Sequence, residues 1–481
     1  MTEVASWLVL SLVLTCHGFV TRDVTKQQQA NLFELSVIHL NDFHARFMQT
    51  GPSSGTCYEE VKDKCLGGIA RVYTASHRLM KERRNAIFLN AGDQFQGTLW
   101  YTLHRWNVTA TFLNMLPHDA LTLGNHEFDD KIPGVVPFLK MIDAPVVVAN
   151  IDATDEPDMK GLYKNSTVLE RGGRKIGVIG AIISSTDTLS SSGKLKFLDE
   201  VESINEEAKK LKDRGVDIIV VLDHCGLEID RIIAKKCPDV DLIVGGHSHT
   251  FLYSGTPPLN DVPEDEYPVV VQQETTNRTV LIVQASAFTR YLGNLTVWFD
   301  EDGEVDSWEG NPILLDASIE EDPEVLQALE PWRIDVDALA NRKIGAIKVP
   351  LSNNCRQAEC NAGNFITDAM VDAFVDKAEN VSSWTYAAIS CMHVGGLRNS
   401  IEKTSGFITF GDLAAMLPFG DVWNAVELLG SDLLQVIEEG VTDSFSETEF
   451  VGKKLLVWSG IKVTYNLSMP AYSRVTEVKV R

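Results

Sequence analysis

Aspartate, histidine and asparagine gather in five short clusters of this chain, and each cluster directly follows an apolar run. The apolar runs lie at residues 35–40, 86–89, 120–123, 217–222 and 240–244. The clusters read NDFH at 41–44, GD at 92–93, GNHEFD at 124–129, DH at 223–224 and GGHSH at 245–249. Imidazole nitrogens with carboxylate and amide oxygens form a ligand set that suits divalent metal ions. One Asp-x-His pair alone would have an ordinary explanation, such as a helix cap beside a surface histidine. Five clusters together predict a metal site.

Two divalent cations that share one carboxylate would account for this set of ligands, and Asp93 is the predicted bridge. The residues assigned to the first ion are Asp42, His44, Asp93 and His249; those assigned to the second are Asp93, Asn125, His224 and His247. Such an ion pair provides a hydroxide nucleophile at neutral pH and neutralises the oxygens of a phosphoryl group. The sequence therefore predicts a phosphoester hydrolase.

His126 follows the predicted ligand Asn125 and is assigned a different role. We expect its imidazole to donate a hydrogen bond or a proton toward the phosphate or the leaving oxygen, with Asp129 fixing its orientation. Thiolate ligands are not needed in such a site, so Cys225 beside His224 is expected to be structural.

Helical patterns at residues 68–83 and 201–214 alternate with the apolar runs, as in a layered α/β domain. In such sheets the ligand crevice lies beyond the carboxyl ends of the strands, where all five clusters would converge. We assign residues 33–320 to this domain, 321–343 to a linking helix, and 344–481 to a second α/β domain.

The N-terminus and the glycosylation sequons point to a secreted protein, and the net charge limits its partners. A formal net charge of −24 disfavours nucleic acid and anionic membranes as partners, because both would be repelled. Residues 1–18 are predicted to be a cleaved signal peptide, and no transmembrane segment or lipid anchor is expected. The close pairs Cys57/Cys65 and Cys355/Cys360 suit local disulfides, which leaves Cys225, Cys237 and Cys391 unassigned. The predicted glycosylation sites are Asn107, Asn165, Asn277, Asn294, Asn380 and Asn466.

With these motifs in view, the chain resembles the 5′-nucleotidase/apyrase family, and most closely the animal ecto-5′-nucleotidase branch that includes salivary apyrases of blood-feeding arthropods. The resemblance runs from about residue 35 to residue 481. It is carried by IHLNDFH at 38–44, AGDQFQGT at 91–98, GNHEFD at 124–129 and GGHSHTFLY at 245–253.

The resemblance implies a calcineurin-like metallophosphoesterase domain with α/β/β/α layers, the same metal ligands, and a catalytic dyad of His126 and Asp129. Zinc would be the usual ion, with calcium or magnesium as alternatives for an apyrase. The C-terminal domain would bind the nucleotide and rotate about the linking helix to deliver phosphate to the metals. A homodimer is a further expectation. The residues that match nucleotide contacts of the family are Arg46, Arg356 and Arg398 for phosphate, Phe419 for the base, and His393, Gly395 and Gly396 in the base-contacting loop.

Two features depart from the family pattern. The family's Asn-Gly-Gly-Gly-Ile-Arg motif reads HVGGLR at residues 393–398, so His393 replaces an amide and Val394 replaces a glycine. Valine disfavours the positive φ that glycine adopts freely. The sequence also ends at Arg481, before the family's segment with a second stacking aromatic and a ribose-binding carboxylate. It is either a fragment or a shortened paralogue.

Three functions follow from these observations. The leading hypothesis is an extracellular 5′-nucleotidase that releases phosphate from AMP. The second is an apyrase that acts on ATP and ADP with the same metal residues. The third is a secreted, non-catalytic nucleotide-binding protein, which His393, Val394 and the short C-terminus favour.

Overall fold

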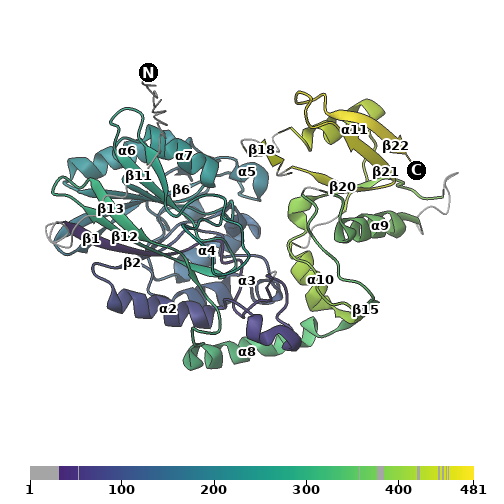
Figure 1. Cartoon of the computed structure of the whole chain (residues 1–481), viewed down its shortest axis with the longest axis horizontal. Helices are drawn as coiled ribbons and strands as arrows, with labels where there is room; N and C mark the ends of the chain where they lie inside the picture. The colour runs from purple at the N-terminus through teal and green to yellow at the C-terminus, as the bar shows by residue number, and fades with distance from the viewer. Residues whose placement is uncertain are drawn as a thin grey trace, which may run out of the picture.

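The computed structural model describes residues 32–480, apart from residues 53, 357, 376–383, 420–422, 443–444, 447–448, 451 and 453. Figure 1 shows two lobes connected along one side by the helix α8 (Pro323–Ala340). The predicted signal peptide and the sequon at Asn380 lie outside the described residues.

Two six-stranded sheets form the N-terminal lobe. The first has the order β13 (Val305–Gly310), β12 (Tyr291–Phe299), β1 (Phe33–Leu40), β2 (Ile87–Asn90) and β3 (Ala120–Leu121), with β14 (Ile313–Leu314) paired to β12. The second has the order β10 (Val269–Gln272), β11 (Thr279–Val283), β9 (Leu242–Val244), β8 (Ile218–His224), β6 (Arg174–Ile182) and β5 (Ser166–Arg171).

The strands that lead to the predicted ligands run parallel to their neighbours. In the first sheet β1, β2 and β3 are parallel, and in the second β6, β8, β9 and β11 are parallel. All seven residues of β8 are buried, as expected for a central strand covered on both faces. Since parallel strands end at the same edge of a sheet, this register gathers the ligand loops there.

The side chains of β1 point alternately to its two faces, and this explains why the two sheets pack face to face. Leu35 and Val37 contribute to the apolar core that includes the second sheet. Ile38 and Leu40, on the opposite face, belong to a second core formed with the helices. Each side of the strand thus buries apolar surface against a different layer.

Helices cover the outer face of each sheet (Figure 1). The helices over the first sheet are α2 (Ile69–Glu82), α3 (Leu99–Leu113) and α4 (Lys131–Met141), and those over the second are α6 (Glu200–Asp213) and α7 (Leu227–Lys236). The smaller elements are η1 (Glu59–Lys64), η2 (Asn125–Phe128), η3 (Pro157–Met159), α5 (Thr186–Leu189), and the pair β4 (Ile151–Asp152) with β7 (Lys196–Phe197). The α/β/β/α layering expected from the sequence is confirmed.

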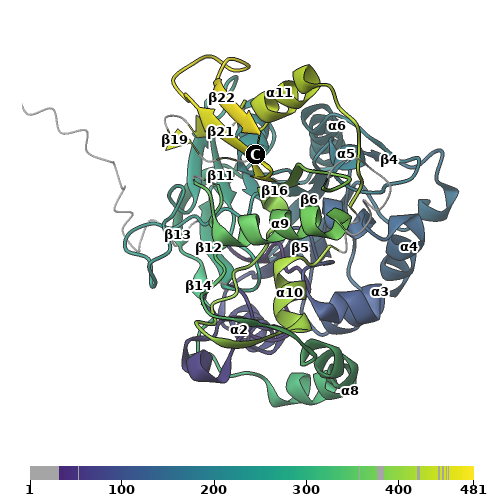
Figure 2. The ribbon, with the colours of Figure 1, turned by 90° about the vertical axis from the view of Figure 1, so that its right-hand side faces the viewer.

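Helix α8 belongs by its packing to the N-terminal lobe. The Asp322 side chain caps it by accepting hydrogen bonds from the backbone N–H groups of Glu324 and Val325. Val325, Leu329 and Val336 are buried in the helix-side core of this lobe. The chain leaves this anchored helix to enter the C-terminal lobe (Figures 1 and 2).

The C-terminal lobe is built from short pairs of strands around a smaller core. Its paired strands are β15 (Lys343–Ile347) with β17 (Gly406–Thr409), β16 (Ser390–His393) with β20 (Leu456–Ser459), β18 (Phe445–Ser446) with β19 (Glu449–Phe450), and β21 (Ile461–Tyr465) with β22 (Val475–Val480). Its helices are α9 (Asn361–Val375), η4 (Val394–Gly396), α10 (Phe410–Met416) and α11 (Gly430–Glu439).

Both predicted disulfides, Cys57–Cys65 and Cys355–Cys360, are present. Cys225 and Cys237 are buried free thiols, whereas Cys391 is exposed. Among the helices of the described residues, none has the length and apolar character needed to cross a bilayer.

Candidate metal centre and active-site cleft

The loops that follow β1, β2 and β9 hold their side chains in an unusual backbone conformation. Asp42, His44, Asp93, His247 and His249 all have positive φ, between 47° and 71°. Residues other than glycine rarely adopt this left-handed region, and such strain tends to gather at functional sites. Five predicted ligands share it, which indicates that tight loops turn these side chains toward one point.

The first group of ligand atoms matches the set assigned to the first ion. Asp42, His44, Asp93 and His249 each offer one atom, and these atoms all lie within 4.8 Å of one another. His249 Nε2 lies 3.2 Å from Asp42 Oδ1 and 3.1 Å from His44 Nε2. Two imidazoles and two carboxylates at these separations can surround one divalent cation.

The second group shares Asp93 with the first. Asp93, His224 and His247 again offer atoms within 4.8 Å of one another, and His224 Nε2 lies 3.0 Å from Asp93 Oδ2. Asn125 joins them because its Oδ1 lies 2.9 Å from His247 Nδ1. The structure therefore brings together all seven residues predicted as ligands, with Asp93 common to both groups.

Neighbouring groups aim the ligand atoms inward. His224 Nδ1 lies 2.7 Å from the Ala91 carbonyl oxygen, which leaves Nε2 for a metal. Asp42 Oδ2 accepts hydrogen bonds from the Asn41 side chain at 2.8 Å and the His247 backbone at 3.1 Å. His224 Nε2 and Asp42 Oδ1 are then buried against other ligand atoms, Asp93 Oδ2 at 3.0 Å and His249 Nε2 at 3.2 Å respectively. Imidazole and carboxylate atoms that gather around one buried point fit a site built for cations.

Charges within the cluster also favour cations. Burial alone would raise the pKa of Asp93, but His224 and His126 hold it well below the ordinary value. Burial alone would lower the pKa of His224, yet Asp93 and Asp42 raise it to about 10. Both shifts have the same origin, because the carboxylates stay charged and attract positive charge. A divalent cation would compete with the proton for His224.

Glu127 supports the centre without being a ligand, a role that the sequence analysis did not assign. Its buried carboxylate accepts hydrogen bonds from four backbone N–H groups, at Asp93, Gln94, Phe95 and Gly124, over 2.6–3.0 Å. This joins the loop after β2 to the loop after β3. Glu127 lies three residues after Gly124, which is the spacing of a capping box. This spacing is the feature of the sequence from which its supporting role could have been predicted.

His126 and Asp129 form a hydrogen-bonded pair beside the ligand groups. His126 Nδ1 lies 2.7 Å from Asp129 Oδ2, and Ser190 donates a hydrogen bond of 2.6 Å to Asp129 Oδ1. Ser190 lies far away in the sequence, and no motif identified it. The pair leaves His126 Nε2 as the nitrogen available to a substrate.

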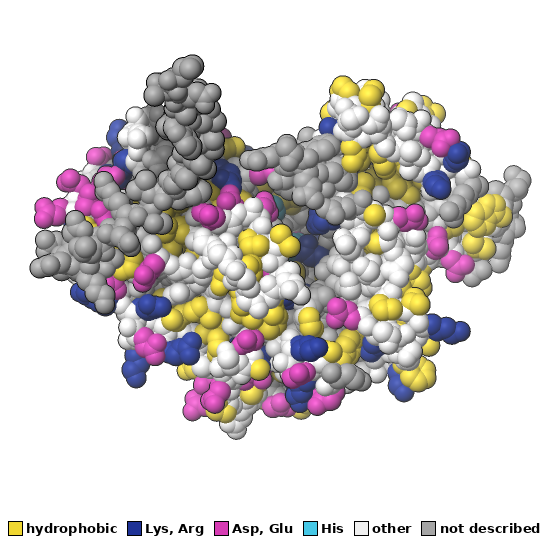
Figure 3. Space-filling model, viewed as in Figure 1, with side chains coloured by type: hydrophobic (Ala, Val, Ile, Leu, Met, Phe, Trp, Pro, Cys, Tyr) yellow, Lys and Arg dark blue, Asp and Glu magenta, His cyan; other side chains and the backbone are white. Residues whose placement is uncertain are grey.

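The ligand groups open into a cleft of about 1360 Å³ between the two lobes. Figure 3 shows Lys and Arg side chains inside the hollow that separates them. The cleft residues predicted from the C-terminal domain are Arg356, His393, Gly395, Gly396, Arg398 and Phe419. Arg398 reaches the metal cluster, with Nη2 3.5 Å from His249 Nε2. The Phe419 ring stacks on the His126 ring, with centroids 5.2 Å apart.

Comparisons with known proteins agree with this architecture. Residues 35–251 match the calcineurin-like phosphoesterase family, and residues 343–481 match the 5′-nucleotidase C-terminal domain family. An apyrase of Tabanus yao is 47% identical over 93% of this chain and 80% of its own length. The 5′-nucleotidase of Mus musculus is 38% identical over 99% of this chain and 82% of its own length.

The chain belongs to the 5′-nucleotidase/apyrase family.

The protein is accordingly a hydrolase with a calcineurin-like N-terminal domain. The crystal structure of a 5′-nucleotidase precursor from Thermus thermophilus superimposes with a TM-score of 0.83 at 35% identity, covering 93% of this chain and 85% of that one. The metallophosphoesterase domain implies divalent metal ions, and the Asp/His groups described above are suited to hold them.

One arginine matched to the family lies elsewhere. Arg46 is buried beside the metal loop, where its Nη1 donates to the carbonyl oxygens of His44 and Gly97 and its guanidinium packs on the Phe288 ring. It lines a second, smaller cavity and is not among the residues of the main cleft. Backbone carbonyls thus hold Nη1, whereas Nε and Nη2 are buried without a hydrogen-bond partner among the described residues. Burial and the nearby Arg398 guanidinium lower the pKa of Arg46, and its contact with phosphate stays a prediction.

The valine that departs from the family motif is accommodated. Val394 begins η4 and is not among the residues with positive φ, so its branched side chain causes no backbone strain. His393 caps this turn, with its Nδ1 accepting a hydrogen bond of 3.1 Å from the Gly395 N–H. His393 Nδ1 therefore stabilises the turn at residues 394–396.

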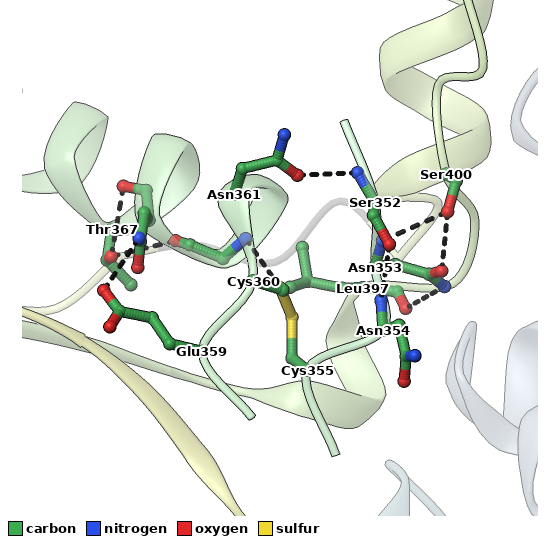
Figure 4. The surroundings of a disulfide bond; sticks show 12 residues. Ser352, Asn353, Asn354, Cys355, Glu359, Cys360, Asn361, Thr367, Leu397 and Ser400 are labelled. Carbon is green, nitrogen blue, oxygen red and sulfur yellow. Dashed lines mark hydrogen bonds between the residues drawn. A yellow bond between two sulfur atoms is a disulfide. The ribbon is translucent and has the colours of Figure 1, made fainter. Parts of the chain in front are cut away.

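The disulfide Cys355–Cys360 lies beside hydrogen bonds that join Asn353 to Leu397 and Ser400 (Figure 4). Ser400 Oγ donates to Asn353 Oδ1 at 2.8 Å and accepts from the Asn353 N–H at 3.1 Å. Asn353 also donates to the Leu397 carbonyl oxygen at 3.2 Å. Arg356 follows Cys355 within this loop and Arg398 precedes Ser400, so the network fixes one loop relative to the other.

Proposed function

We propose that the protein is a secreted, metal-dependent 5′-nucleotidase that releases inorganic phosphate from extracellular AMP and leaves adenosine. The observation that carries the proposal is the pair of ligand groups sharing Asp93, which open into a cleft whose other wall carries Arg356, Arg398 and Phe419. The ligand groups suit phosphoester chemistry, and the facing arginines suit an anionic substrate.

Each group in the cleft would have its own role in the hydrolysis. Bound cations would supply Lewis-acid chemistry, neutralising charge on the phosphoryl group and activating water. Arg398 would hold phosphate oxygens, since its planar guanidinium can donate two parallel hydrogen bonds. Asp129 would accept a hydrogen bond from His126 Nδ1 and stabilise the imidazolium, so that the Nε2 proton can be donated toward the leaving oxygen. Phe419 would stack against the base once it leaves the His126 ring.

Secretion and zinc belong to the same proposal. The apolar run before residue 18 supports an exported protein. Of the five sequons among the described residues, Asn107, Asn165, Asn277 and Asn466 are exposed, whereas Asn294 is half-buried within β12. Glycans are therefore expected at the exposed four. Zinc suits the mixture of imidazole and carboxylate ligands. A homodimer stays a prediction.

The second candidate is an apyrase that removes phosphate from ATP and ADP. The 47% identity to the Tabanus yao apyrase favours it. Both activities would use the same metal ligands and dyad, so the difference must lie in how the cleft places a longer phosphate chain.

Phosphate release from AMP, ADP and ATP, measured on the zinc-loaded and the chelator-treated protein, tests the proposal. We expect zinc-dependent release from AMP. Release from ADP with none from AMP would replace the leading candidate by the apyrase. Binding of AMP without release from any nucleotide would identify a non-catalytic nucleotide-binding protein. The variant His126→Ala should lose activity and keep its metals by elemental analysis, whereas loss of metals would make His126 a ligand.

A further inference from the structure

A polar contact joins the two lobes at a point away from the cleft. Tyr58, in the N-terminal lobe, donates a hydrogen bond of 2.6 Å to Asp412 Oδ1 of α10 in the C-terminal lobe. Lys403 Nζ lies 2.8 Å from Asp412 Oδ2 and 4.6 Å from the centre of the Tyr58 ring. We refer to Tyr58, Lys403 and Asp412 as the clasp.

The Asp412 carboxylate is fully engaged by these contacts. It is 3% exposed, and its Oδ2 also accepts a hydrogen bond of 2.8 Å from the Thr409 N–H. Burial alone would raise the pKa of Asp412, but the hydrogen bonds from Lys403 and Tyr58 bring it below its ordinary value. The clasp thus joins a neutral hydroxyl to a buried, charged acceptor, which is one of the stronger kinds of hydrogen bond.

On the N-terminal side the clasp has a rigid base. Tyr58 lies in the loop closed by the Cys57–Cys65 disulfide. Thr50 and Leu66 exchange two backbone hydrogen bonds of 2.8 Å below that loop. The same loop continues directly from the metal-ligand segment after β1. Its position is therefore fixed relative to the metal centre.

On the C-terminal side the clasp holds the element that carries the cleft residues. Asp412 lies in the first turn of α10, and Phe419 follows the end of the same helix. The Arg398 N–H donates a hydrogen bond of 2.9 Å to the carbonyl oxygen of Met416, the last residue of α10. Holding α10 at its start thus orients both Arg398 and Phe419.

A second approach of the lobes lies beside the clasp. A Cβ atom placed on Gly55 would lie 3.2 Å from the Ser400 carbonyl oxygen and 4.0 Å from Asn399 Cβ. Ser400 belongs to the network that joins the loops of Arg356 and Arg398 (Figure 4). Residues 55–58 therefore contact the C-terminal lobe both at α10 and at the segment that carries Arg398.

We propose that the clasp sets the orientation of the C-terminal lobe over the metal centre, which makes Tyr58 and Asp412 positioning residues for the hydrolysis. The effect on turnover rests on the proposed function, whereas the effect on lobe orientation does not. Losing the Tyr58 hydroxyl should lower the population of the orientation in which Arg398 reaches His249.

Two measurements on the full chain with Tyr58→Phe test this proposal. The first is kcat/KM for AMP with zinc, which should fall about tenfold, as for the loss of a hydrogen bond to a charged group. The second is the rate of disulfide formation in a Gly55→Cys/Asn399→Cys variant, since 4.0 Å is a suitable Cβ separation for a disulfide. Adding Tyr58→Phe should slow this cross-link severalfold.

The matched control is Tyr163→Phe, which removes a hydroxyl whose partner, the Ile151 carbonyl, lies in the same lobe. It should change neither measurement. A clasp variant with unchanged cross-linking would overturn the proposal, even if kcat/KM fell, and so would slower cross-linking with unchanged kcat/KM. Failure of the cross-link to form in the presence of Tyr58 would also overturn it. A protein inactive on every nucleotide would refute the proposed function, while the cross-linking rates would still report on the clasp.

Discussion

On the N-terminal side of the cleft, Asp42 and His224 are 0% exposed and Asp93 is 2% exposed. On the C-terminal side, Arg356 is exposed and Phe419 is half-buried. The first wall consists of tight loops on two packed sheets, and the second consists of loops held by a disulfide network and a short helix. This contrast separates a buried, rigid centre, suited to chemistry, from a more exposed wall whose position depends on the contacts that hold its loops.

Removing the carboxylate shared by both ligand groups should have the largest effect on the metal centre. Asp93→Ala takes a ligand from both groups, so we expect both ions to be lost and activity to fall by about 10⁴-fold or more. Elemental analysis and phosphate release measure the two effects. Asp213→Asn, an exposed carboxylate at the end of α6, is the control and should retain both. Retention of both ions by Asp93→Ala would refute the shared-ligand arrangement.

A methyl group added at Gly124 should disturb the same metal centre through steric overlap alone. A Cβ on Gly124 would lie 2.2 Å from Asp93 Oδ1 and 2.6 Å from the Asp93 backbone nitrogen. Gly124→Ala must therefore displace Asp93, and we expect a loss of activity of about 100-fold with weaker metal binding. Gly430→Ala is the matched control, because its Cβ would meet no atom within 4 Å. Zinc affinity is measured by metal titration. Normal zinc affinity in Gly124→Ala would contradict this expectation.

Ser190 donates a hydrogen bond to Asp129 from a loop distant in sequence, and its substitution tests whether this bond contributes to catalysis by the dyad. Ser190→Ala removes the hydrogen bond to Asp129 Oδ1 and leaves the ligand groups unchanged. We expect kcat for AMP to fall about tenfold, because its alkoxide leaving group needs a proton. With p-nitrophenyl phosphate, whose leaving group is a stable phenolate, the loss should be less than about twofold. Ser190→Thr should restore activity on AMP. Equal losses on both substrates would mean that Ser190 acts only on the structure.

Much of the rigid wall could be predicted because its elements are local and strongly patterned. The helix expected over residues 201–214 is α6 (Glu200–Asp213), and the helix expected over 68–83 is α2 (Ile69–Glu82). The ligands follow apolar strands in sequence, so the order of strands and clusters predicted that they would meet. The domain limits and the roles of individual site residues stay predictions.

The contacts that the sequence did not reveal join segments far apart in the chain. Ser190 and Asp129 are separated by 61 positions, and Tyr58 and Asp412 by 354. Serine and tyrosine at such positions are ordinary surface residues until the fold brings their partners near. Arg46 is a related case, since a matching position in a motif did not reveal that the backbone carbonyls of His44 and Gly97 would hold one nitrogen of its guanidinium.

The prediction furthest from the chemistry concerns stability, and it rests on a buried histidine outside the ligand groups. Burial lowers the pKa of His39 to about 3, and its Nε2 lies 2.9 Å from the Tyr267 hydroxyl. Since the unfolded chain takes up a proton near pH 6.5 and the folded chain does not, His39 lowers the stability progressively as pH falls below 6.5. At pH 5 this amounts to roughly 2 kcal/mol.

His39→Gln removes this titrating group while keeping a polar side chain of similar reach. The loss of unfolding free energy between pH 7.5 and pH 5 should shrink by roughly 2 kcal/mol in urea titrations, whatever the variant costs at pH 7.5. Arg84→Gln, an exposed side chain on the same lobe, should leave the pH dependence unchanged. An identical pH dependence in His39→Gln and the unaltered protein would show that His39 is protonated in the folded state, and that the interior between the sheets is more polar than its burial indicates.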